Sequence, residues 1–303
     1  MNNFQGRIAV LTGAASGFGL EMARLGAQHG MKLVLADVQA DALERAAAEL
    51  RQTGAEVLAR RVDVSQAVEV DALAAATRER FGVPHLVFNN AGVGAGGLVW
   101  ETPATEWQWV LGVNLFGVAH GVRAFTPMML EAASADPGYE GRIVNTASMA
   151  GLLNPPNMGA YNVSKHAVVS LSETLYHDLS LVTERISASV LCPYFVPTGI
   201  HQSFRNRPAD AGTAAARPTR SQRIAQAMTS KAVESGKVSA SDVAALVFDA
   251  LRERRFYIYS HPKAIGSVRT RMEDILLARN PSDPFADKPE IGAELRAALR
   301  ALD

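Results

Sequence analysis

The sequence of 303 residues has very little of several things, and each shortage excludes a class of protein. Its single cysteine, Cys192, has no partner for an intrachain disulfide, which fits a reducing compartment. No apolar run approaches the roughly 20 residues that a membrane-spanning helix needs. Residues 1–6 lack the basic start of a signal peptide. We therefore expect an unprocessed cytoplasmic protein with no membrane segment.

An excess of charge of one sign is missing too. The 30 basic residues balance 30 acidic ones, and no stretch combines clustered Lys and Arg with aromatic residues, so we expect no nucleic-acid partner. His120, His177 and His201 lack the spacing of metal ligands, and we expect no catalytic metal. What the chain does have is 48% hydrophobic residues, enough for a large packed core.

Short β-branched runs alternate with longer Ala-rich segments of helical period through the first two thirds of the chain. This alternation is typical of βα units on a parallel sheet. The expected strands are 8–12, 33–36, 56–62, 85–89, 142–146, 186–191 and 256–259. The expected helices between them are 17–29, 40–53, 67–81, 106–132, 160–183 and 240–252. The pattern predicts an α/β fold with a doubly wound, Rossmann-type parallel sheet of about seven strands.

Two segments do not follow this alternation. From Pro193 to about Thr219 the chain is rich in Pro, Ala, Arg and Gly without periodicity, which predicts an active-site lid over about residues 193–230. Residues 261–303 contain two helical segments, near 263–278 and 291–302, around a Pro-rich turn. We therefore expect one domain over residues 1–260 and a C-terminal helical extension, 261–303, packed on it.

A glycine-rich loop follows the first expected strand and opens into a helix. In this loop Gly13 permits a tight turn, Gly17 lets the backbone approach a pyrophosphate, and Gly19 allows close packing of helix on strand. Free N–H groups and the positive end of the helix dipole favour an anion at this point. We expect the loop, through Gly13, Ser16, Gly17, Phe18 and Gly19, to bind the pyrophosphate of a dinucleotide.

Asp37 ends the second expected strand, eighteen positions after Gly19. A carboxylate there can accept the ribose hydroxyls of NAD and would repel the 2′-phosphate of NADP, so NAD is the expected cofactor. NADP stays open, because Arg60 or Arg61 could approach its phosphate. Asp37 could also simply cap the following helix.

Further motifs follow in order: Asp63-Val64, Asn89-Asn90-Ala91-Gly92, Asn114, Ser148, Tyr161-x-x-x-Lys165 and Pro193-Tyr194-Phe195-Val196-Pro197-Thr198. With the glycine loop they resemble the short-chain dehydrogenase/reductase family over about residues 6–259. The resemblance implies a catalytic set of Ser148, Tyr161, Lys165 and Asn114. The cofactor contacts it implies are Asp63, Val64, Asn90, Ala91, Gly92, Tyr161, Lys165, Pro193, Val196 and Thr198. Tyr194 departs from the family, which usually has Gly there.

The expected chemistry is interconversion of an alcohol and a ketone. Tyr161 would be the general acid/base, and Lys165, one helical turn away, would lower its pKa. An ammonium ~5 Å away at an effective dielectric constant of ~20 contributes on the order of 3 kcal/mol, about two pKa units. Ser148 would hydrogen-bond the substrate oxygen. By resemblance, Asn114 would hold a water that links Lys165 to solvent.

The expected substrate is a hydrophobic secondary alcohol or ketone, because the residues expected around it are apolar. They are Met149, Leu153, Met158, Tyr194 and Phe195. Arg205 and Arg207 in the lid leave an anionic group on the substrate open. By resemblance, segments 106–132 and 160–183 would pair in a homodimer or homotetramer. Two alternatives remain: a non-catalytic NAD-sensing protein, and a lyase or epimerase on the same scaffold.

Overall fold

The computed structural model describes residues 1, 3–207 and 218–301. In these parts of the chain, seven strands form one sheet in the order β3-β2-β1-β4-β5-β6-β7. The strands are β1 (Ile8–Thr12), β2 (Lys32–Asp37), β3 (Val57–Arg61), β4 (Leu86–Asn89), β5 (Gly141–Thr146), β6 (Ile186–Cys192) and β7 (Tyr257–Tyr259). Every neighbouring pair is parallel. The expected doubly wound Rossmann-type sheet is confirmed, and its strand bounds agree within a residue or so.

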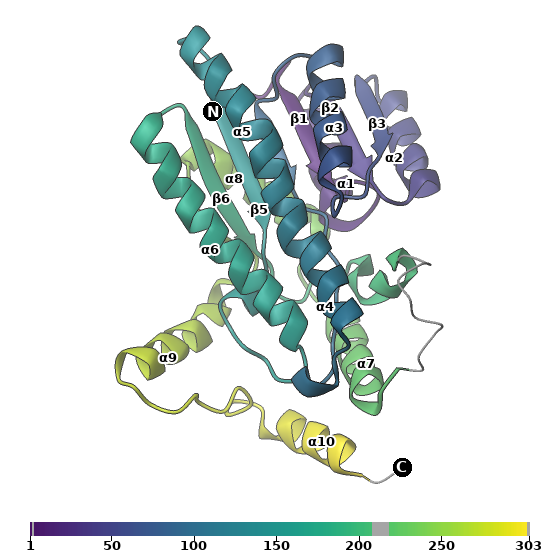
Figure 1. The fold of residues 1–303 in the computed structure, drawn as a ribbon, viewed down its shortest axis with the longest axis vertical. Helices are drawn as coiled ribbons and strands as arrows, with labels where there is room; N and C mark the ends of the chain where they lie inside the picture. Colours follow the sequence, from purple (N-terminus) through teal and green to yellow (C-terminus); the bar gives the residue numbers. More distant parts are fainter. Residues whose placement is uncertain (2, 208–217, 302–303) are drawn as a thin grey trace.

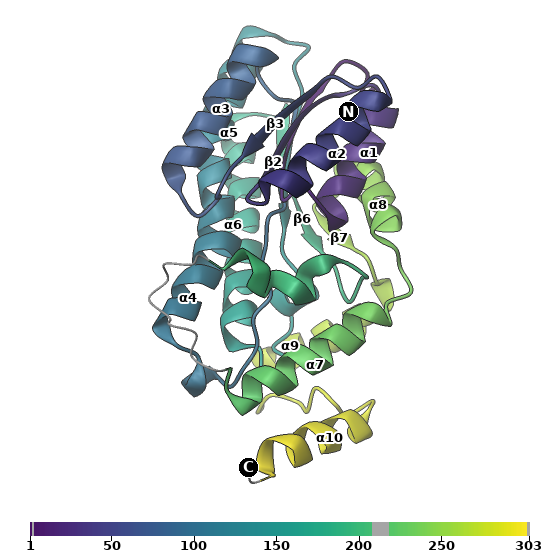
Figure 2. The ribbon, with the colours of Figure 1, turned by 90° about the vertical axis from the view of Figure 1, so that its right-hand side faces the viewer.

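Helices cover both faces of the sheet because its central strands are apolar on both sides (Figure 1, Figure 2). One face packs against α1 (Gly17–Gln28), α2 (Ala40–Gln52) and α8 (Ala240–Glu253). The other packs against α3 (Ala67–Arg80), α5 (Gly117–Ala135) and α6 (Gly159–Val182). Since the strand order reverses between β1 and β4, the loops at their carboxyl ends diverge and leave a crevice there.

One expected helix, 106–132, is divided in the structure. It consists of α4 (Ala104–Leu111), the π-helical turn η2 (Gly112–Phe116) and α5. The three follow one another without a break (Figure 1). A π turn places one extra residue in a helical turn, and such turns are frequent at functional sites. Asn114 lies in this turn.

The segment expected to be an aperiodic lid contains helices. The short helix η4 (Gly199–Asn206) follows β6, and α7 (Arg220–Glu234) lies between the sheet and α10 in the view of Figure 2. No helix was expected over 220–234. Its start carries a capping box, in which Thr219 and Gln222 each bond the other's backbone N–H. Residues 208–217 of the expected lid lie outside the described residues.

The C-terminal extension consists of η5 (Pro262–Ala264), α9 (Ile265–Leu276) and α10 (Pro289–Arg300). Its two longer helices agree with the expected ones within a few residues. The helix α10 lies against α7 at the end of the molecule farthest from β3 (Figure 2). Across the described residues, no helix combines the length and apolarity required to cross a bilayer.

Candidate active site

A cleft of about 2200 Å³ opens at the carboxyl ends of the strands. Its walls come from the loops after β1, β2, β4, β5 and β6, and from α7, α9 and α10. The expected site residues that line it are Gly13, Ser16, Gly17, Phe18, Asp37, Asp63, Val64, Asn90, Ala91, Gly92, Ser148, Met149, Leu153, Met158, Tyr161, Lys165, Pro193, Tyr194, Phe195, Val196 and Thr198. Gly19 and Asn114 lie behind this wall. The sequence motifs therefore meet in one space, although they are scattered over nearly 200 positions.

The glycine loop has the shape that a dinucleotide phosphate requires. Gly13 and Gly17 have φ values of 64° and 55°, in the left-handed region that favours glycine. A Cβ on Gly19 would lie 2.1 Å from the carbonyl oxygen of Gly13, so a larger residue would displace the loop. Ser16 forms no capping hydrogen bond with the described residues, and the first N–H groups of α1 remain available. The loop therefore fits a pyrophosphate.

Asp37 lies at the other wall of this part of the cleft. Its Oδ1 accepts a hydrogen bond from the backbone N–H of Gln39, and its Oδ2 accepts one from Ala15, each at 3.0 Å. Burial raises the pKa of Asp37, and these hydrogen bonds partly offset the rise. Arg60 and Arg61 lie on β3 outside the cleft, and the Arg61 Nη1 is 3.2 Å from Glu69 Oε2.

Asn90 joins the loops after β1 and β4. Its backbone N–H donates to the Thr12 Oγ1 at 2.9 Å, and its side-chain Nδ2 donates to the Thr12 carbonyl at 3.0 Å. The Thr146 Oγ1 donates to the Asn90 Oδ1 at 3.2 Å, which adds the loop after β5. At the cleft wall beside β3, the Asp63 Oδ1 accepts the N–H and the Oγ of Ser65. These bonds set the shape of the crevice.

Asn114 is completely buried, with 0% of its surface exposed. Its Oδ1 accepts the N–H of Val93 at 2.8 Å, and its Nδ2 donates to the Val93 carbonyl and to the Ser164 Oγ, both at 3.0 Å. The side chain thus ties the loop after β4 to α6, the helix that carries Tyr161. This geometry makes Asn114 a positioning residue. A water relay through it stays a prediction.

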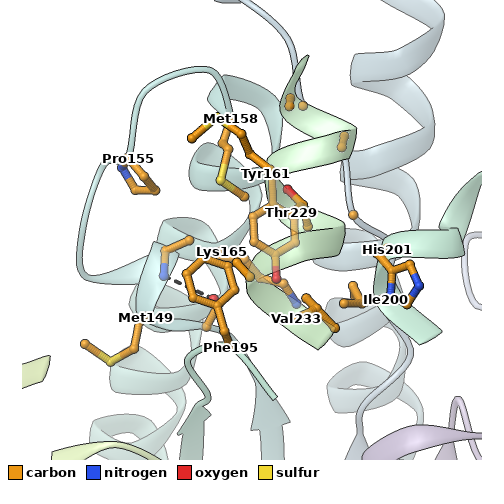
Figure 3. A pocket seen from close by; sticks show the side chains of 18 of the residues that line it. Met149, Pro155, Met158, Tyr161, Lys165, Phe195, Ile200, His201, Thr229 and Val233 are labelled. Atoms are coloured by element: carbon orange, nitrogen blue, oxygen red, sulfur yellow. Dashed lines mark hydrogen bonds between the residues drawn. The ribbon is translucent and has the colours of Figure 1, made fainter. Parts of the chain in front are cut away.

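Tyr161 and Lys165 lie together in the cleft (Figure 3). Ser148, which follows β5, lines the same cleft and is hydrogen-bonded to Tyr161. Lys165 is 2% exposed, its Nζ donates to the Thr146 carbonyl at 2.9 Å, and this nitrogen is 5.7 Å from the centre of the Tyr161 ring. Ser148 precedes the short helix η3 (Met149–Gly151), where its Oγ accepts the N–H of Ala150 at 3.1 Å. A reacting C–O group in this space would meet a phenol, a serine hydroxyl and a buried amine.

The pKa of Tyr161 differs from the expectation. Burial raises it, while the hydrogen bond with Ser148 acts to lower it. Burial also lowers the pKa of Lys165 to about 8. Desolvation is the largest cause of both shifts and acts against the expected Coulomb effect. The net pKa of Tyr161 therefore lies above its ordinary value, and the lowering expected from Lys165 stays a prediction.

The substrate side of the cleft has a wall of aromatic rings. Tyr194, 46% exposed, makes edge contacts with Phe195 at 4.6 Å and with His261 at 5.7 Å between ring centres. Met158 and Pro155 lie above Tyr161 (Figure 3). Met149 borders the cleft but is 1% exposed, and its side chain points away from Tyr161 into a core cluster with Val268 (Figure 3).

Several lining residues were not expected from the sequence. Thr229 and Val233 of α7 line the cleft near Tyr161, as do Ile200 and His201 of η4 (Figure 3). The capping box at Thr219 could have revealed α7, since the pattern of a Thr followed three positions later by Gln is readable in a sequence. Cys192 stays a core residue: it is buried, and burial raises the pKa of its thiol to about 12.

Known proteins are similar to this chain both in sequence and in fold. A family model described as short chain dehydrogenase matches residues 7–209. A short chain dehydrogenase/reductase from Burkholderia phymatum, solved in complex with NAD, is 56% identical, with a TM-score of 0.90 over 94% of this chain and 99% of that one. The CLA biosynthesis dehydrogenase/reductase of Lactiplantibacillus plantarum is 33% identical over 91% of this chain and 95% of its own length. The 1-deoxy-11-beta-hydroxypentalenate dehydrogenase of Streptomyces exfoliatus is 35% identical over 90% of each chain. The chain therefore belongs to the short-chain dehydrogenase/reductase family of oxidoreductases.

Proposed function

We propose that the protein interconverts a hydrophobic secondary alcohol and its ketone with NAD as the hydride carrier. One observation carries this proposal: the Tyr161, Lys165 and Ser148 groups line the same cleft as the glycine loop and Asp37. A non-catalytic NAD-sensing protein would need only the glycine loop and Asp37, without the three reactive side chains. A lyase or epimerase would return its cofactor unchanged after each turnover.

In the proposed mechanism, the nicotinamide supplies or accepts a hydride when bound, and the protein manages the proton and the charge on oxygen. The Ser148 Oγ donates a hydrogen bond to the substrate oxygen as charge develops on it. The Tyr161 hydroxyl accepts the proton of the alcohol during oxidation and returns it during reduction. Lys165, with a pKa of about 8, can exchange a proton near neutral pH. Asn114 keeps α6 aligned with the loop after β4.

The test is the absorbance at 340 nm of a mixture of protein, NAD⁺ and a panel of secondary alcohols. Steady formation of NADH supports the proposal. Binding of NAD⁺ without NADH formation, across secondary alcohols of graded size, would support a sensor. Conversion of a substrate without any change at 340 nm would support a lyase or epimerase.

The apolar wall favours a substrate with a bulky hydrophobic body. Tyr194, Phe195 and Met158 offer rings and a thioether and carry no formal charge that would bind an anionic group. The relative from Streptomyces exfoliatus is named for a hydroxypentalenate, and its name fits a hydroxyl on a carbon skeleton. We infer that the substrate of this protein likewise carries a hydroxyl group on a hydrophobic carbon skeleton.

We also infer that two copies pair through α5 and α6, which gives a homodimer or a homotetramer.

Replacing Asp37 is expected to change cofactor preference. In Asp37→Ala, the ratio of kcat/KM for NADP⁺ to that for NAD⁺ should rise about tenfold, because a carboxylate no longer repels the 2′-phosphate or accepts the ribose hydroxyls. Asp41→Ala is the matched control, since Asp41 is an exposed carboxylate in the first turn of α2. If the unmodified enzyme already prefers NADP⁺, the assignment of Asp37 is wrong.

A further inference from the structure

The helix η4 and the residue that follows it carry two arginines with different surroundings. Arg207 forms an ion pair with Glu106, which is almost fully buried, and its guanidinium lies 5.1 Å from the Trp109 ring centre. Its charge is therefore already balanced, and its position is set by α4. Arg207 is poorly placed to bind an anionic group of the substrate.

Arg205 instead lines the same cleft as the glycine loop and Asp37. Its guanidinium lies beside Gly199. A Cβ added to Gly199 would lie 2.8 Å from the Arg205 Nη2 and 3.4 Å from its Nη1. Thr198, the residue before Gly199, lies beside the glycine loop. A Cβ added to Gly17, the loop glycine expected to approach a pyrophosphate, would lie 3.4 Å from the Thr198 side chain. Burial raises the pKa of Asp37, and the positive charge of Arg205 is among the groups that partly oppose this rise. The guanidinium thus borders the part of the cleft that fits the adenosine and phosphates of a dinucleotide.

A second contact fixes η4 over the same region. The Gln39 Nε2 donates to the Asn206 Oδ1 at 2.6 Å, which joins residues 167 positions apart. Gln39 also bonds Asp37 through its backbone N–H. Within η4, the Arg205 Nη1 donates to the neutral Gln202 Oε1 at 2.8 Å, a bond that orients the guanidinium and leaves its charge intact.

We propose that Arg205 binds a phosphate group of the dinucleotide and so holds η4 closed over the cofactor. The inference rests on the proposed function only in taking a dinucleotide as the ligand. A planar guanidinium can donate two parallel hydrogen bonds to one phosphate, and the α1 N-terminus would contact the same anion from the opposite wall. Two phosphates are candidates: the pyrophosphate shared by NAD and NADP, and the 2′-phosphate of NADP.

The test measures binding without turnover. Dissociation constants of NAD⁺, NADP⁺, ADP-ribose and adenosine are determined by calorimetry for the unmodified protein, Arg205→Gln and Arg205→Lys. The control is Arg60→Gln, an exposed arginine on β3 outside the cleft. In Arg205→Gln we expect the dissociation constant of a phosphate-bearing ligand to rise about tenfold, while that of adenosine stays within twofold. The dissociation constant for Arg205→Lys should lie between those of the unmodified protein and Arg205→Gln, because lysine keeps the positive charge but cannot donate two parallel hydrogen bonds.

The ligands separate the two phosphates. If Arg205→Gln binds NAD⁺, ADP-ribose and NADP⁺ all more weakly, Arg205 contacts the pyrophosphate. If only the affinity for NADP⁺ falls, Arg205 contacts the 2′-phosphate. Unchanged binding of all three would overturn the proposal, as would an equal loss for adenosine, which carries no phosphate. Because no substrate is used, a protein that binds the cofactor through Arg205 but oxidises no alcohol would refute the proposed function alone.

Discussion

Replacing Tyr161 by Phe is expected to lower kcat by about 10²- to 10⁴-fold, the usual contribution of a positioned general acid or base. The phenylalanine ring keeps the packing of Tyr161 on α6 and removes only the hydroxyl that exchanges the proton. The dissociation constant of NAD⁺, measured by calorimetry, should change little, because the glycine loop and Asp37 are untouched. Steady-state rates at saturating NAD⁺ and alcohol provide the measurement.

The control for this variant is Tyr176→Phe, which removes an exposed phenol farther along the same helix. It should leave kcat unchanged. The unmodified enzyme should also oxidise alcohols faster as pH rises from neutral to alkaline and reduce ketones more slowly. The direction follows because burial raises the pKa of Tyr161, so that the phenolate needed for oxidation forms only at high pH. Equal kcat in Tyr161→Phe and the unmodified protein would remove Tyr161 from the mechanism.

Ser148→Ala is expected to lower kcat/KM by about 10²- to 10³-fold, the loss seen when one donor to a developing oxyanion is removed. Ser148 also has a structural role, because its Oγ caps η3 by accepting a hydrogen bond from the N–H of Ala150. Loss of a cap alone costs about 1 kcal/mol of stability and should not change the chemical step. Kinetics and thermal unfolding of the same variant therefore separate the two effects.

Ser239→Ala is the matched control for capping. Ser239 is the N-cap of α8, where its Oγ accepts the N–H of Asp242 at 3.1 Å, and it does not line the cleft. This variant should lose a similar amount of stability and keep full activity. If Ser148→Ala resembles Ser239→Ala in both measurements, Ser148 is a structural cap and the oxyanion assignment fails.

The alternation of apolar runs was sufficient to predict the sheet, because both faces of its central strands are buried and such a strand is mostly apolar. The strand Ile8–Thr12 is the clearest instance, since all five of its residues are buried. The motifs also indicated where the chemistry lies, because parallel strands bring their carboxyl ends to one edge. The loops after β1, β4 and β5 could therefore be placed together from the sequence.

Features that depend on distant contacts were not predictable in this way. The helix α7 buries Ser221, Ala225 and Val233, of which only Val233 is a sizeable apolar residue, so the segment contains little that marks a core-facing helix. The π turn at Asn114 continues the helical pattern on both sides and leaves no sign in the sequence. The hydrogen bond from Gln39 to Asn206 joins segments that no local pattern relates. The upward effect of burial on the pKa of Tyr161 could not be predicted, because burial cannot be measured along a chain.

The division of the cleft walls has a consequence for how such an enzyme can change. The proposed proton-transfer groups stand at the end of β5 and on α6, whereas much of the opposite wall comes from α7 and from the C-terminal helices α9 and α10. The proposed reactive groups and a large part of the cleft wall thus come from separate lengths of one chain. Substitutions in α7, α9 and α10 can reshape the cleft, and so change the molecules that it admits, while Ser148, Tyr161 and Lys165 stay in place. The intervening α8 and β7 pack in the core and are not free to change in this way.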